Sequence, residues 1–131
     1  MPQLMMKHEE DPADTLLKSI GDLSGVELFN NQVLVAIYMR PEKTSSGLYL
    51  PEKNRDEDRY QSKIGLLIKK GDQAFVDPEK EWFSGADFSI GRDWLLFRPS
   101  DGWSVTINKM PCRIFDDISI KGRVPHPDFI W

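Results

Sequence analysis

The chain has 131 residues, which is enough for one domain, and 40% of them are hydrophobic and 11% aromatic, too many for a disordered chain. Its 17 basic and 21 acidic side chains give a net charge of −4, which argues against a nucleic-acid binder held by phosphate neutralisation. No apolar run approaches the ~18 residues that span a bilayer, no signal peptide opens the chain, and a single cysteine excludes an intramolecular disulfide framework. We expect a soluble single-domain protein of a reducing compartment.

Residues 1–30 form an acidic arm ahead of the first expected strand. Asp11-Pro12 favours a helix start, because an acid suits the positive end of a helix and proline is tolerated at its first position. Apolar residues then follow at helical spacing on one face, namely Leu16, Leu17 and Ile20. We expect a short amphipathic helix of one or two turns in this arm.

From Gln32 the pattern changes to the period of two that is typical of β-strands. Short strands are expected at 32–40, 64–69, 94–97, 105–107, 112–115 and 118–121, with a brief alternation at 88–90 and a hairpin turn at Asn108-Lys109. No periodic helix of normal length appears after residue 25. Short strands separated by turn signals predict an all-β fold, a small barrel or sandwich.

The segment 42–63 separates the first two expected strands and is longer than the usual connection. It is highly charged except for one apolar triplet, Leu48-Tyr49-Leu50, which stands between Gly47 and Pro51. Two interpretations are open. The triplet is either a strand end that turns its side chains into the core, or an exposed tag that docks into a partner's groove. Ordering such a loop costs entropy, so the second contact would be weak alone and strong when many copies act together.

The candidate catalytic and metal-ligating residues of the sequence form no credible active site. His8 and His126 have no neighbours in sequence that would orient them as a base or a metal ligand. Cys112 lies in an expected strand, where a free cysteine behaves as a small buried hydrophobe. Asp116 and Asp117 are adjacent, so in a strand they would face opposite ways, and we interpret them as a solvated turn. No phosphate-binding glycine loop is present. We expect no catalytic residue, no metal site and no cofactor.

The order of these features resembles the GroES-like co-chaperonins. Val33-Leu34-Val35, followed by the stretch 42–51, is similar to the first strand and mobile loop of that family. Three further segments are similar to later family elements: 64–71, 88–97 and the acidic turn 116–118. The resemblance covers roughly residues 30–124. It implies a small, partly open β-barrel at 31–124 with a projecting loop at 42–63, usually assembled in rings of seven.

In that family a glycine and an apolar triplet of the loop bind the chaperonin ring. Carried over by position, this implies a partner-binding motif formed by Gly47, Leu48, Tyr49, Leu50 and Pro51. GroES-like proteins also occur in tailed bacteriophages, where the resemblance implies a role in head assembly.

The chain departs from the family pattern in its arm, in two bulky segments at 82–85 and 98–103, and in a tail at 125–131. The tail ends in Phe129-Ile130-Trp131, which would be a liability if exposed, so we expect it to be buried against a partner or folded back. We interpret the arm through Ile20 and this aromatic end as anchors that are buried only in an assembly.

Two functions follow. The leading expectation is a structural protein, a phage capsid accessory of the decorating or stabilising kind, which binds the capsid protein lattice and resides in the virion after assembly in the host cytoplasm. The alternative is a cytoplasmic phage-type co-chaperonin that caps a chaperonin ring and assists capsid-protein folding. Both imply a homo-oligomer or many copies on an assembly, and neither involves nucleic acid or a membrane.

We predict that the protein turns over neither ATP nor any small substrate, because the sequence supplies no phosphate loop, nucleophile–base pair or ligand cluster. The measurement is nucleotide hydrolysis by repurified protein. Saturable hydrolysis that vanishes on a single point substitution would overturn this prediction.

Overall fold

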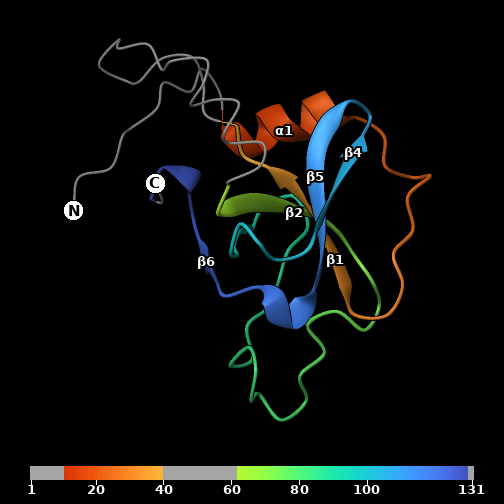
Figure 1. Ribbon diagram of the computed structural model, residues 1–131. Coiled ribbons are helices and arrows are strands. Elements are labelled where there is room, and N and C mark those ends of the chain that lie inside the picture. Colours follow the sequence, from red (N-terminus) through yellow and green to blue (C-terminus); the bar gives the residue numbers. More distant parts are fainter. Residues whose placement is uncertain (1–10, 40–61, 130–131) are drawn as a thin grey trace.

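The computed structural model describes residues 11–39 and 62–129 (Figure 1). Its strands are β1 (Gln32–Ile37), β2 (Ile64–Lys70), β3 (Trp94–Leu96), β4 (Trp103–Ile107), β5 (Met110–Asp116) and β6 (Gly122–Val124). Its helices are α1 (Pro12–Ile20) and two single turns of 3-10 helix, η1 (Asp117–Ser119) and η2 (Pro127–Phe129). The strands form one six-stranded sheet in the order β4-β5-β1-β2-β3-β6, with every pair antiparallel. The all-β expectation is confirmed.

Both faces of the central strands are buried. In β1, each residue from Val33 to Ile37 is at most 1% exposed, whichever face it lies on. Leu34 and Ala36 pack in one apolar cluster, whereas Val33 and Val35 pack in another on the opposite face. A strand that is covered on both sides needs apolar residues at consecutive positions, which explains the run Val-Leu-Val-Ala-Ile.

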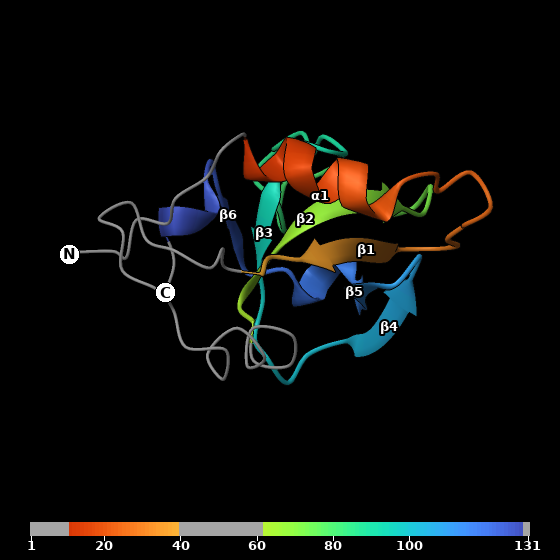
Figure 2. The same cartoon turned by 90° about the horizontal axis from the view of Figure 1, so that it is seen from above.

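Helix α1 covers the first of these faces (Figure 2). Asp11 caps it, because one carboxylate oxygen accepts from the backbone N–H of Ala13 at 3.0 Å, and Pro12 opens the first turn. Leu16 and Ile20 point into the sheet and are 7% and 1% exposed. The expected helix is confirmed.

The sheet curls strongly toward its other face. The rings of Phe97, just after β3, and Phe115, in β5, lie 4.6 Å apart between centroids. In the sheet order two strands separate β3 from β5, and three strand spacings of about 4.8 Å would hold the strands roughly 14 Å apart in a flat sheet. The contact therefore requires curvature, which lets the strands enclose a second apolar core without a second helix.

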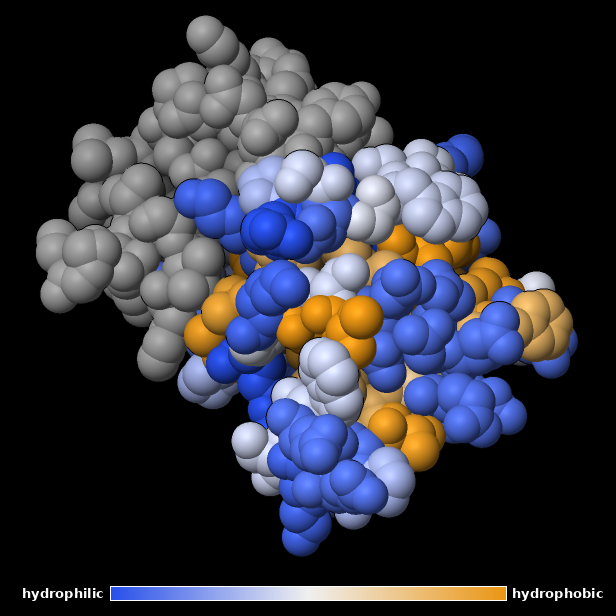
Figure 3. Space-filling model, turned by 60° about the horizontal axis from the view of Figure 1, so that its bottom comes forward, coloured by the Kyte–Doolittle hydropathy of each residue, from blue (hydrophilic) through white to orange (hydrophobic). Residues whose placement is uncertain are grey.

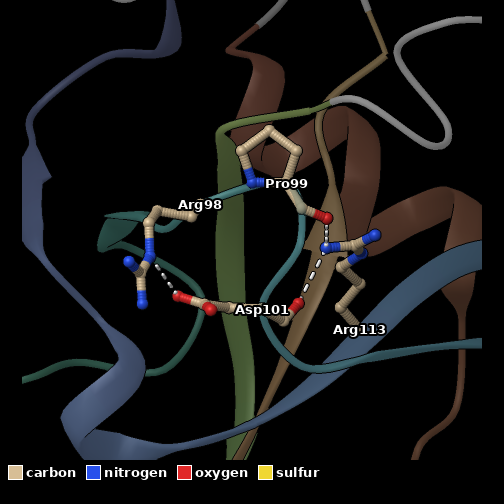
Figure 4. A network of polar contacts seen from close by, with 4 residues as sticks. All are labelled: Arg98, Pro99, Asp101 and Arg113. Atoms are coloured by element: carbon tan, nitrogen blue, oxygen red, sulfur yellow. Dashed lines mark hydrogen bonds and ion pairs between the residues drawn. The ribbon is translucent and has the colours of Figure 1, made fainter.

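A turn between β3 and β4 is fastened to β5 by Arg113 (Figure 4). Its guanidinium donates to the carbonyl oxygen of Pro99 and, at 2.8 Å, to that of Asp101. Arg98 donates in turn to the Asp101 carboxylate at 3.0 Å. Burial lowers the pKa of Arg113, an effect that the charge of Asp101 opposes.

The hairpin expected at Asn108-Lys109 joins β4 to β5, and both residues have positive φ, 49° and 68°, as a two-residue hairpin turn requires. The Asn108 side-chain amide also donates to the carbonyl oxygens of Ile20 at 2.7 Å and Asp22 at 3.0 Å. The hairpin turn therefore fastens the end of α1 to the sheet.

The expected strand at 118–121 is wrong, since residues 117–119 form η1 and the last strand, β6, begins at Gly122. The cause is Asp117, which is 6% exposed rather than solvated. Its carboxylate accepts from the Asn31 side chain at 3.0 Å and from the backbone N–H of Phe75 at 2.9 Å. These bonds draw the chain into a turn. Asp116 is exposed as expected.

The alternation at 88–90 does not form a strand either. The Asp93 carboxylate accepts from the backbone N–H of Ser89 at 2.7 Å, and Gly91 has a φ of 81°, so this stretch is a turn that leads into β3. No helix in the described part of the chain has the length and apolar character needed to cross a membrane.

We predict that Gly102→Ala destabilises the fold by roughly 2 kcal/mol or more, because the site combines a φ of 70° with a close approach. A Cβ there would lie 2.6 Å from the Ile114 carbonyl oxygen and 2.5 Å from the Phe115 ring. The measurement is urea unfolding. The matched control is Gly85→Ala, where φ is 75° but the nearest atoms belong to the flexible Lys80 side chain. Equal losses of unfolding free energy in the two variants would show that the close approach at Gly102 does not matter.

Candidate partner-binding site

Most residues of the expected partner-binding motif and aromatic end lie outside the described residues: Gly47, Leu48, Tyr49, Leu50, Pro51, Ile130, Trp131 and the side chain of Phe129. The structure does describe where the segment 40–61 is attached. Ile37 of β1 pairs with Gly65 of β2, and the backbone N–H of Tyr38 donates to the Ile64 carbonyl oxygen at 3.3 Å. Both ends of the segment therefore leave the centre of the sheet side by side, at a place we call the stem, formed by Tyr38, Ser62 and Ile64.

The stem is held by buried side chains on both strands. Tyr38 is 2% exposed, and its ring meets Trp94 edge to face with centroids 5.6 Å apart. Ser62 is also 2% exposed, and its hydroxyl donates to the Ile64 carbonyl oxygen at 2.9 Å. The two chain ends are thus fixed in position and direction where the segment 40–61 begins and ends.

The C-terminal turn η2 meets the stem. The Tyr38 hydroxyl lies 3.3 Å from a carboxylate oxygen of Asp128, which is 2% exposed. His126 accepts at Nδ1 from the backbone N–H of Asp128 at 3.1 Å. In both ribbon views η2 lies at the same end of the sheet as the start of β2 (Figures 1 and 2). The two segments that carry the expected partner-binding residues therefore depart from one end of the molecule.

This cluster corrects the expectation about His126. His126 does have an orienting neighbour, Asp128, although no signal in the sequence joins either residue to Tyr38, 90 positions from Asp128. Asp128 and Pro127 are buried within the chain, whereas the expected anchor Phe129-Ile130-Trp131 stays a prediction, because its side chains lie outside the described residues. Tyr38 and Asp128 form a buried tether in which the hydroxyl donates to the carboxylate, and the backbone N–H of Asp128 donates to Nδ1 of the half-buried His126.

The arm is corrected in the same way. Leu16 and Ile20 were expected to be buried only in an assembly, but they are buried against the chain's own sheet. The physical reason is that the outer face of β1 and β2 is itself apolar and needs a cover, which α1 supplies.

The remaining candidates from the sequence are Cys112 and the metal-ligating side chains. Cys112 is a buried small hydrophobe, as expected, and burial raises the pKa of its thiol to about 11. Among residues 11–39 and 62–129, no group of three or more histidine, cysteine or acidic side chains is placed to hold a metal ion.

Large apolar side chains on the surface are a second kind of partner site. Trp82 is 68% exposed, Phe29 65% and Trp103 60%. Figure 3 shows several aliphatic and other strongly hydrophobic side chains, in orange, between hydrophilic side chains on one face of the molecule. Trp82 and Trp103 come from the two segments whose bulk departs from the family pattern, but sequence reasoning assigned no site to either.

Comparison with protein-family models gives no match, and no curated protein matches the chain. The resemblance to GroES-like co-chaperonins therefore rests on the residue pattern alone.

We predict that Leu16→Ala lowers the free energy of unfolding by about 2–4 kcal/mol, because it removes a fully covered side chain between α1 and the sheet. The measurement is chemical denaturation of the isolated protein. Ser19→Ala, on the exposed side of the same helix, is the control and should stay within about 0.5 kcal/mol. Unchanged stability in Leu16→Ala would restore the interpretation of the arm as an assembly anchor.

Proposed function

We propose that this chain is a non-enzymatic, GroES-like assembly protein that binds its partner through Gly47-Leu48-Tyr49-Leu50-Pro51. The observation that carries the proposal is the stem. β1 and β2 are directly paired antiparallel neighbours, which a connection of two to five residues is able to join, yet 26 residues separate Ile37 from Ile64. A long insertion between two paired strands is not needed to build the sheet, which supports a functional role.

The stem also suits a binding loop energetically. Tyr38 and Ser62 are each buried and hydrogen-bonded to other described residues. Substitutions within 42–61 are then expected to leave the sheet intact. Fixed loop ends also reduce the number of conformations that an inserted segment must lose when it binds.

Of the two functions, the co-chaperonin is the better supported. The expectation of a capsid accessory depended in part on the arm as an anchor that is buried only in an assembly, but α1 packs on its own sheet. The triplet Leu48-Tyr49-Leu50 is then the strongest remaining candidate for a chaperonin contact. In this function the protein acts in the host cytoplasm, as a ring of identical chains that caps a chaperonin.

The capsid accessory function is the second candidate, and the exposed aromatic residues favour it. Trp103 stands 60% exposed on the edge strand β4, and Phe29 is 65% exposed outside the sheet. A protein that is held in a lattice uses several such surfaces at once, and many weak contacts together give firm retention. In this function the protein resides in the virion.

We predict that changing Leu48, Tyr49 and Leu50 together to Ser abolishes partner binding and leaves the melting temperature within a few degrees, since exposed loop substitutions each cost less than ~0.5 kcal/mol. The measurements are thermal unfolding and co-sedimentation with a chaperonin ring plus ATP and, separately, with purified phage particles. The matched control changes Asp56, Glu57 and Asp58 of the same segment to Ser.

The two assays separate the functions. Loss of chaperonin binding in the triplet variant alone supports the co-chaperonin. Stoichiometric retention on particles that survives the triplet change supports the capsid accessory. A collapse of the fold in the triplet variant would place the triplet in the core and contradict both.

A further inference from the structure

A hollow of about 230 Å³ lies beside β6, apart from the stem. Residues of the irregular loop before β3 form one wall, and the chain from the end of η1 into β6 forms the other. Its lining consists of Trp82, Phe83, Ser84, Ala86, Phe88, Ile120, Lys121, Gly122 and Arg123.

Two of the lining residues, Phe83 and Phe88, belong to a packed aromatic group that Phe75 completes from behind the hollow's floor. Phe75 and Phe88 stack with centroids 3.9 Å apart and an angle of 11° between ring planes. Phe83 meets both rings edge to face, at 5.1 and 5.6 Å. Each ring is positioned by the other two, so the floor is preformed.

The wall that carries Trp82 is also preformed, although it contains no regular secondary structure. The Asp77 carboxylate accepts from three successive backbone N–H groups, those of Glu81 at 3.0 Å, Trp82 at 3.0 Å and Phe83 at 2.7 Å. These bonds fix the loop while leaving Trp82 68% exposed at the rim.

The charged residues that line the hollow are all positive. The lining includes two cations, Lys121 and Arg123, and no carboxylate. Arg123 is already engaged, with its guanidinium 4.9 Å from the Phe88 ring centre and 3.2 Å from the Asp93 carboxylate. The Lys121 side chain is exposed, and no carboxylate of residues 11–39 or 62–129 forms an ion pair with it. One positive charge beside an aromatic hollow is therefore available to a partner.

We propose that this hollow docks an acidic segment of a protein partner, which inserts one large apolar or aromatic side chain against Trp82 and the aromatic floor and sets a carboxylate at Lys121. The size supports a single side chain, since pockets for whole small ligands begin at about 300 Å³. Aromatic walls and a preformed pocket are typical of the positions that dominate binding energy in protein interfaces. The charge of the lining selects an acidic partner over a basic one. The site is independent of the Gly47–Pro51 motif.

The test is a titration of the full chain with a capped tripeptide of glutamate, phenylalanine and glutamate. Binding is monitored by ¹H–¹⁵N NMR. We expect saturable shifts of the Trp82 indole N–H and the Gly122 amide, with the Trp103 indole unmoved. The matching tripeptide with lysine in place of glutamate should leave all three signals in place. Lys121→Gln should weaken binding by about threefold, the size of an exposed ion pair, and added salt should do the same.

Trp82→Ala should abolish binding. Two variants are controls for unrelated effects. Trp103→Ala, at an exposed tryptophan on β4, should leave binding unchanged and is the control for Trp82→Ala. Lys109→Gln, in the β4–β5 turn, is the control for Lys121→Gln. Equal binding of both tripeptides, unaltered binding by Trp82→Ala, or no shift at Trp82 would each overturn the proposal. Shifts at Trp82 that depend on protein concentration without peptide would instead assign the hollow to a second copy of the chain.

Discussion

The structure depends on the burial of both faces of β1 and β2. These strands are so apolar that neither face tolerates water, and the chain covers each face by a different means. Helix α1 lies over one face and contributes Leu16 and Ile20. Over the other face the sheet bends until Phe97 meets Phe115, and Arg113 fastens the intervening turn. The open sheet order, with β4 and β6 at its edges, follows from a curvature that encloses the core without joining the two edge strands.

The burial of both faces of β1 and β2 also bears on the segment 40–61, which connects these two strands. Within the described residues, α1 and the curvature of the sheet already cover the two central strands that flank this segment. Its ends are fixed by Tyr38 and Ser62, and η2 contributes Asp128 to the same place. A rigid sheet that presents a long segment from one end is a sound basis for recognition, because the cost of ordering falls on few residues. The aromatic hollow at Trp82 is proposed as a second contact with a partner. Its loop is held in place by the Asp77 carboxylate, which accepts hydrogen bonds from successive backbone N–H groups.

Local features were predictable from the sequence, and distant ones were not. Asp11-Pro12 and the spacing of Leu16 and Ile20 predicted α1, because capping and helical periodicity act within a few residues. The strands expected at 32–40 and 64–69 correspond to β1 and β2, although β1 ends at Ile37 and is buried on both faces, and Asn108-Lys109 marked a tight hairpin. The strand expected at 118–121 failed because Asp117 bonds to Asn31, 86 positions away. The Tyr38–Asp128 tether and the cover by α1 were missed for the same reason, since no local pattern reports a partner at that separation.

The position of β1 in the sheet also bears on how the chain folds as it is synthesised. Val33 pairs on one side with Lys70 and on the other with Phe115, so β1 is flanked on both sides only after β5 has emerged from the ribosome. Helix α1 is made first but must wait for the same strands, because its docking surface includes Cys112 and Trp94. An isolated helix of nine residues is marginal in water. The nascent chain therefore exposes the apolar faces of α1 and β1 until β5 has been made, and such non-local pairing is typical of slow folding.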